Sequence, residues 1–167
     1  LEISKKFPNL GAWGGGVVPE YEGIRPSWFN SEEESYLACR IVDCDVWSND
    51  PSHWVAIPFG AGLVVRSCVI SAHLNLLERE PLRKKLDRVG SQLLGGGDVD
   101  IVRTSIREGL GFGCFANLQL IHLIPKKRQS VNYIERLVFG SSASLALLEH
   151  LDGRKMVCSY NYKRELL

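Results

Sequence analysis

The stretch GGGDVDIVRTSIREGLGFGCFANLQLIHLIP occupies residues 95–125 and sets a loop, a helix and a strand in succession. Its three leading glycines indicate a loop, because glycine adopts backbone conformations that other residues avoid. Residues 100–108 predict a short helix, and Gly109 suits the C-terminal cap of that helix. Residues 118–124 alternate in a pattern that predicts a buried strand, which Pro125 ends. A helix followed by a strand favours a mixed α/β arrangement.

The segment that follows predicts a long helix. Between residues 131 and 151, apolar side chains recur at the spacing of one helical face. The run Gly140-Ser141-Ser142 is an expected weak point within that helix, because glycine lowers helix stability.

The segments before residue 95 also predict strands and helices that alternate along the chain. Gly14 to Val18 predict a turn that leads into a short strand, and residues 63–66 predict a second strand. Ser31 begins a predicted capping box and helix, and Pro81 is expected to break a charged helical stretch over residues 76–89. The predicted fold class is therefore α/β, with a mixed sheet flanked by helices in a single domain of residues 1–167.

Composition narrows the classes of function. Apolar residues make up 45% of the chain and charged residues 23%, and the formal net charge is +1. A nucleic-acid-binding domain usually has a clear basic excess, so no nucleic-acid partner is expected. No apolar stretch reaches the roughly 20 residues that cross a bilayer, so no transmembrane segment is expected.

The number and spacing of the cysteines indicate whether the protein works in a reducing or an oxidising compartment. There are five, and none forms a C-x-x-C pair. An odd number without motif spacing predicts reduced thiols and a cytoplasmic location.

Asp98 is the leading candidate for chemistry. It follows three glycines directly, so its carboxylate could face a cleft and remove a proton from a hydroxyl as a general base. Asp100, two residues later, is predicted to point elsewhere and to cap the helix or fix the loop. The alternative is that Asp98 or Asp100 is only a helix N-cap, which is a common role for aspartate.

Three further features are candidates for binding. His122 lies among apolar residues, and it is either a metal ligand or a buried histidine bonded to the backbone. Gly60-Ala61-Gly62 is either a ligand-binding loop or an ordinary tight turn. Lys126-Lys127-Arg128 could meet a diphosphate, although a solvated loop is the commoner explanation for such a run.

Taken in order, these segments resemble the C-terminal half of bacterial family 2 glycosyltransferases, which have the GT-A fold. The resemblance runs from about Trp13 to Leu151, and its motifs are WGGGVVPEYE (13–22), PFGAGLVVR (58–66), RVG (88–90), GGDVDI (96–101) and LQLIHLIP (118–125) followed by Arg128. Each motif alone is weak, and their joint order and spacing are more specific. At Gly97 the chain departs from the family, in which an acidic residue often precedes the catalytic aspartate.

The resemblance implies a function for each of these positions. Such enzymes transfer a sugar from a nucleotide-diphosphate donor to an acceptor hydroxyl, usually with inversion. Asp98 matches the catalytic base, and Gly60, Ala61, Gly62 and Asp100 match the acceptor side. Arg128 would contact the donor diphosphate, and His122 would bind a divalent metal, Mg or Mn. The binding partners would be a nucleotide-sugar and a carbohydrate or other hydroxyl acceptor.

The resemblance also implies what lies outside this chain. The nucleotide-binding half, with its metal-binding Asp-x-Asp motif, is expected upstream of residue 1, so that these 167 residues alone are expected to be inactive. The full-length protein is expected in the cytoplasm, with peripheral membrane attachment as an alternative. The alternative function is a carbohydrate- or protein-binding module without catalysis.

Overall fold

The computed structural model describes residues 2–87 and 93–154, and the motif at Arg88 to Gly90 lies outside them. Four strands form one sheet: β1 (Leu10–Tyr21), β2 (Val46–Ser48), β3 (Val64–Val65) and β4 (Gly111–Ile124). The α-helices are α1 (Glu2–Lys6), α2 (Ser31–Tyr36), α3 (Ser67–Arg79), α4 (Gly97–Arg107) and α5 (Val131–Leu151). The short 3-10 helices are η1 (Trp54–Ala56), η2 (Pro81–Leu86) and η3 (Lys126–Arg128).

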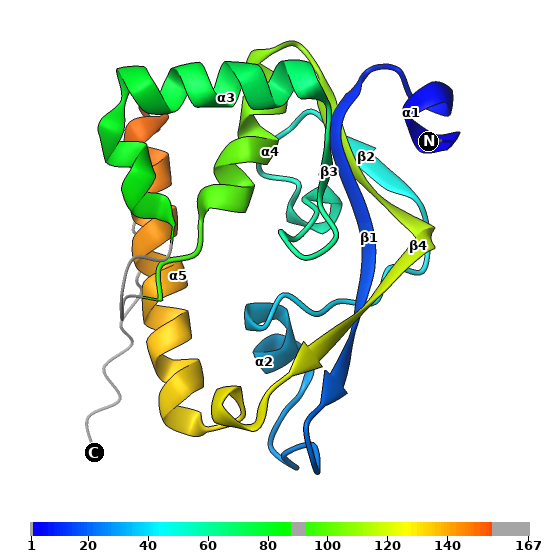
Figure 1. Ribbon diagram of the computed structural model, residues 1–167, viewed down its shortest axis with the longest axis vertical. Coiled ribbons are helices and arrows are strands. Elements are labelled where there is room, and N and C mark those ends of the chain that lie inside the picture. Colours follow the sequence, from blue (N-terminus) through cyan, green and yellow to red (C-terminus); the bar gives the residue numbers. More distant parts are fainter. Residues whose placement is uncertain (1, 88–92, 155–167) are drawn as a thin grey trace, which may run out of the picture.

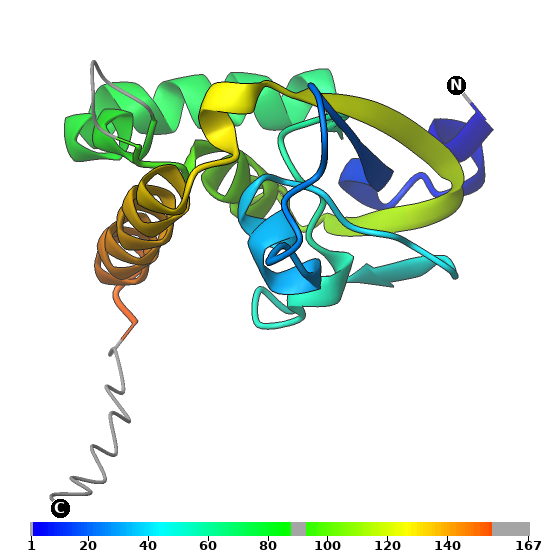
Figure 2. The same cartoon turned by 90° about the horizontal axis from the view of Figure 1, so that it is seen from below.

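The sheet is mixed and has the strand order β2-β4-β1-β3. Its centre is the parallel pair β1 and β4, and the short strands β3 and β2 pair antiparallel with them on either side. Parallel neighbours need a crossover connection, and here the crossover carries α3 and α4. Figures 1 and 2 show α3, α4 and α5 on one side of the long strands, with α1 near the opposite edge. The predicted α/β class with a mixed sheet flanked by helices is confirmed.

The glycines of β1 do not form the predicted turn, because they lie in the middle of a twelve-residue strand. The register between β1 and β4 shifts there: Gly15 is opposite Phe115, whereas Gly16 is opposite Gln119. A Cβ on Gly15 would lie 2.0 Å from the carbonyl oxygen of Leu118. The glycine is therefore required by the close approach of the bulged strand.

The strand predicted at residues 118–124 exists as the second half of β4, but the prediction that it is buried is wrong. Ile121 is 65% exposed and Leu123 is 61% exposed, whereas Phe112 and Phe115 in the first half are buried. The first half lies between β1 and β2. Beyond Phe115, β1 is the strand that pairs with β4 among the described residues. The alternating pattern therefore predicted the strand correctly but not its burial.

The helices agree with the sequence in part. Pro81 ends the helical stretch as predicted, Gly109 follows α4 with a φ of +73°, and α5 has the predicted bounds. Two predictions about helix starts were wrong. Asn30, and not Ser31, is the N-cap of α2 and forms the capping box with Glu33. Helix α4 begins at Gly97, before the predicted start at Asp100.

The helical stretch predicted over residues 76–89 overlaps only the end of α3 (Ser67–Arg79), so most of this helix was not predicted. Within the described ranges, no helix has both the length and the apolar character needed to span a bilayer.

Candidate functional site

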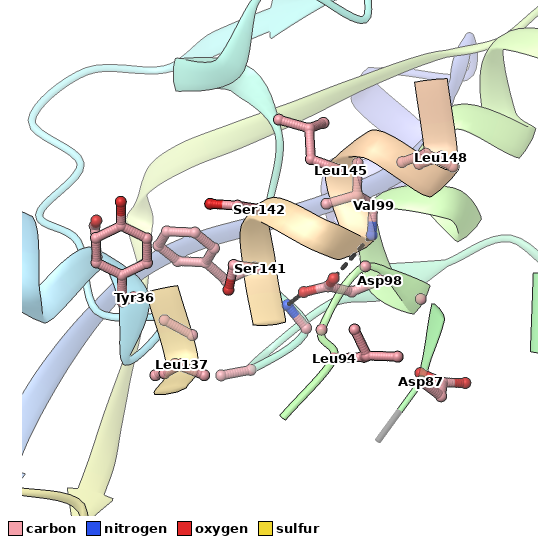
Figure 3. Close-up of a pocket in the computed structure, with 18 of the residues that line it drawn as sticks. Tyr36, Asp87, Leu94, Asp98, Val99, Leu137, Ser141, Ser142, Leu145 and Leu148 are labelled. Carbon is pink, nitrogen blue, oxygen red and sulfur yellow. Dashed lines mark hydrogen bonds between the residues drawn. The ribbon is translucent and has the colours of Figure 1, made fainter. Parts of the chain in front are cut away.

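A cavity of about 850 Å³ lies between the loop at Gly60, the N-terminal end of α4 and one face of α5 (Figure 3). The polar groups on its wall include Asp87, Asp98, His122 and Arg128. Helix α5 contributes Leu137, Ser141, Ser142, Leu145 and Leu148. A cavity of this size is large enough for a small-molecule ligand.

Asp98 lies in the first turn of α4 and its carboxylate is held by two backbone amides. The amide of Gly60 donates a hydrogen bond to Oδ2 at 2.7 Å, and the amide of Val99 donates to Oδ1 at 2.9 Å (Figure 3). The N-cap of α4 is Gly96, so the interpretation of Asp98 or Asp100 as the cap is wrong. Asp98 instead connects the helix to a loop 38 residues earlier in the chain.

The environment of Asp98 changes its basicity. Burial raises the pKa of its carboxyl above the ordinary value, while the hydrogen bonds from Gly60 and Val99 act in the opposite direction. The net shift is upward, so burial outweighs the hydrogen bonds. A carboxylate with a raised pKa accepts a proton more readily, which is what a general base requires.

Arg40 contacts the segment that leads into the glycine loop beside Asp98. The guanidinium of Arg40 donates to the carbonyl oxygens of Trp54 at 3.1 Å and Ile57 at 2.7 Å, and it lies over the ring of Phe59. Gly60 and Ala61 line the cavity. Gly62 does not line it: its φ is +77°, and it makes the turn that leads into β3.

His122 and Arg128 reach the cavity from β4 and η3. Nδ1 of His122 lies 3.9 Å from Sγ of Cys39. Burial, followed by the negative charge of Glu34, raises the pKa of Cys39 to about 11. In the absence of a metal ion, the Cys39 thiol is therefore protonated near pH 7.

The described residues do not complete a metal site. Across residues 2–87 and 93–154, no group of three or more His, Cys, Asp or Glu side chains could hold a metal ion together. A divalent cation beside His122 would need additional ligands from elsewhere, so no step of the chemistry below is assigned to a metal.

Asp100 does not lie at the cavity, contrary to the predicted acceptor contact. Its side chain is fully buried, and Oδ1 accepts from Arg83 at 2.7 Å and from Arg107 at 3.4 Å. Both arginines also bind Asp152 at the end of α5. Asp100 thus anchors α4 to η2 through Arg83, and its full burial disagrees with a direct contact to an acceptor.

The glycine-rich loop before Asp98 rests on α5. The amide of Gly95 donates to Oγ of Ser144 at 3.0 Å, and that hydroxyl donates to the carbonyl of Gly140 at 2.9 Å. A Cβ on Gly140 would lie 2.1 Å from the carbonyl oxygen of Leu93. Gly140 is therefore a close-packing position in an unbroken helix, and not the predicted weak point.

Sequence reasoning missed Asp87 and the wall formed by α5. Asp87 lies at the end of η2, and its carboxylate overlies Gly97, where a Cβ would be 2.2 Å from Oδ1. This contact is the physical reason for glycine at position 97. The small residues of α5 were visible in the sequence, but nothing there indicated which segment they face.

Comparison with known proteins gave no match: no protein family, no curated protein and no solved structure is significantly similar to this chain.

Proposed function

We propose that this chain is the acceptor-side half of an inverting glycosyltransferase, in which Asp98 is the general base. The observation that carries the proposal is the position of the Asp98 carboxylate. It lies in the wall of a ligand-sized cavity and is fixed by the Gly60 amide at 2.7 Å. Of the seven residues predicted for the site, Asp98, Gly60, Ala61, His122 and Arg128 line this one cavity.

The proposed reaction is a direct displacement. A hydroxyl oxygen of the acceptor attacks the anomeric carbon of the donor sugar, and its proton passes to the carboxylate of Asp98. The bond between the anomeric carbon and the nucleotide diphosphate breaks, and the diphosphate leaves with the electron pair. Proton removal by a positioned base contributes about 10²–10⁴-fold to such a step.

The remaining residues of the cavity suit a sugar. Arg128 supplies a positive charge for the diphosphate. Tyr36, Trp54 and Phe59 also line the cavity, and aromatic side chains offer apolar faces to a sugar ring. The Mg or Mn ion that the resemblance implies, the nucleotide-binding half and a cytoplasmic location remain parts of the proposal.

The test is sugar transfer by the full-length protein that the gene encodes, with Asp98→Asn as the variant. Donors would be UDP-glucose, UDP-galactose, UDP-N-acetylglucosamine and GDP-mannose, with methyl glycosides as acceptors and release of nucleotide diphosphate as the readout. Asp98→Asn is expected to reduce turnover by about 10²–10⁴-fold. Activity within a few fold of wild type would show that Asp98 is not the base.

Asp43→Asn is the matched control, because Asp43 is exposed and does not line the cavity. It removes one carboxylate and is expected to keep full activity. Residues 1–167 alone are expected to show no turnover, because donor binding is assigned to the other half.

A carbohydrate-binding module without catalysis is the second candidate. It is favoured by the aromatic residues of the cavity, since stacking on a sugar requires no base. In that case Asp98→Asn would weaken sugar binding, and no donor would be consumed by the full-length protein.

A further inference from the structure

A second carboxylate lies beside Asp98 in the same cavity wall. Asp87 follows η2, which is tied to the glycine loop by a hydrogen bond of 2.9 Å from the Gly96 amide to the Leu86 carbonyl. The Asp87 carboxylate occupies the space directly over Gly97, the residue before Asp98. Figure 3 shows Asp87 and Asp98 at the same end of the cavity.

The two carboxylates have different surroundings. Asp98 is partly buried and accepts hydrogen bonds from two backbone amides. Asp87 is exposed and lines the cavity. Its charge adds to the raised pKa of Asp98, as a smaller contribution than burial. Asp87 thus places a carboxylate, which can accept hydrogen bonds, on the cavity wall.

We infer that Asp87 is a second ligand-contacting residue, which accepts a hydrogen bond from another hydroxyl of the molecule whose attacking hydroxyl faces Asp98. This inference rests on the proposed function and narrows its substrate class. The acceptor would be a polyol such as a sugar, because an alcohol with a single hydroxyl leaves Asp87 without a partner. Asp87 forms no covalent bond and takes no proton in the transfer.

A purely structural role is the competing explanation. A carboxylate near the N-terminal end of a helix stabilises the helix through its dipole, and Asp87 is close to the start of α4. That role predicts a change in stability, whereas a ligand contact predicts a change in binding that depends on one particular hydroxyl.

The experiment is an NMR titration of the ¹⁵N-labelled chain with methyl glucoside, methyl galactoside and methyl mannoside, together with the monodeoxy derivatives of each. For the glycoside that binds, Asp87→Asn is expected to weaken affinity about 10-fold or more, as for a lost hydrogen bond to a charged group. One monodeoxy derivative should bind wild type and Asp87→Asn equally, because it lacks the hydroxyl that Asp87 contacts. Asp43→Asn should bind as wild type does.

The outcomes separate the inference from the proposed function. Equal binding of every probe to wild type and Asp87→Asn overturns the inference, and if Asp98→Asn still weakens binding, the proposed site stands. A loss of affinity by Asp87→Asn that is the same for all deoxy derivatives also overturns it, since no specific hydroxyl is then contacted. If no glycoside binds the wild-type chain, the proposed function itself fails and the inference fails with it.

Discussion

The backbone amide of Gly60 donates to Oδ2 of Asp98 at 2.7 Å, and a Cβ on Gly60 would lie 3.0 Å from that same oxygen. The loop thus approaches the carboxylate as closely as a residue without a side chain permits. This contact joins two segments that the resemblance assigns to the acceptor side, and it fixes the direction in which the carboxylate points.

Gly60→Ala should therefore disturb the site more than the fold. The added methyl group must displace the Asp98 carboxylate or the loop by a few tenths of an ångström, because 3.0 Å is too short for this contact. We expect turnover by the full-length protein to fall at least 10-fold, since catalysis depends on exact positioning, with a change in stability of about 1 kcal/mol or less.

Gly95→Ala is the matched control for Gly60→Ala. A Cβ on Gly95 would meet no atom of the described residues within 4 Å, and its amide would still donate to Ser144. Kinetics and urea unfolding of both variants check the prediction. Equal activity of the two variants would show that the Gly60 contact does not position Asp98.

The raised pKa of Asp98 predicts a specific dependence of stability on pH. Because burial holds the folded-state pKa above the ordinary value of 3.8, the folded protein binds this proton more tightly than the unfolded chain. Ionising Asp98 in the folded state therefore costs free energy. The stability of wild type relative to Asp98→Asn should decline as pH rises from about 4 through the raised pKa, and then level off.

Urea unfolding of wild type and Asp98→Asn at pH 4, 5, 6 and 7 measures this difference. An increase in the relative stability of wild type over the same range would mean that the amides of Gly60 and Val99 outweigh burial. The carboxylate would then be a weaker base than proposed.

Five of the seven residues predicted for the site line one cavity, whereas the predicted burial of residues 118–124 is wrong. The contact between Gly60 and Asp98 was not predicted, because it joins segments 38 residues apart in the chain. Apolar alternation at 118–124 predicted a strand correctly, but its burial depends on how many strands lie beside it, which no local pattern encodes. Asp87 was not predicted, because its contact with Gly97 depends on where η2 ends relative to α4.

The ion-pair network at the end of α5 predicts the opposite dependence on pH. Burial acts to raise the pKa of Asp152, but Arg107 and Arg103 together outweigh it and the pKa lies below the ordinary value. Asp152 therefore stabilises the fold above about pH 4, and this contribution is lost as pH falls through the depressed pKa.

Asp152→Asn should destabilise the chain by about 3 kcal/mol at pH 7, because it removes one carboxylate partner from each of the buried side chains of Arg83 and Arg103. The difference from wild type should shrink at pH 3. Urea unfolding at both pH values checks this, and a difference that does not depend on pH would mean that the charge of Asp152 is not what stabilises the fold.

Gly140→Ala reverses an ordinary rule. Alanine in a helix interior is normally about 1 kcal/mol more favourable than glycine. Here the new methyl group would lie 2.1 Å from the carbonyl oxygen of Leu93, so the loop that precedes Asp98 must move away from α5. We expect a net destabilisation of about 1–3 kcal/mol, as for overpacked sites, together with weaker ligand binding.

Phe139→Ala is the control that tests whether the loss of stability in Gly140→Ala comes from the contact with Leu93. Phe139 is the neighbouring residue on α5 and is 78% exposed, so its removal should leave stability nearly unchanged. Urea unfolding and glycoside titration of both variants give the answer. If Gly140→Ala is more stable than wild type, the loop before Asp98 adapts freely to the added methyl group. The position of Asp98 then does not depend on its contact with α5.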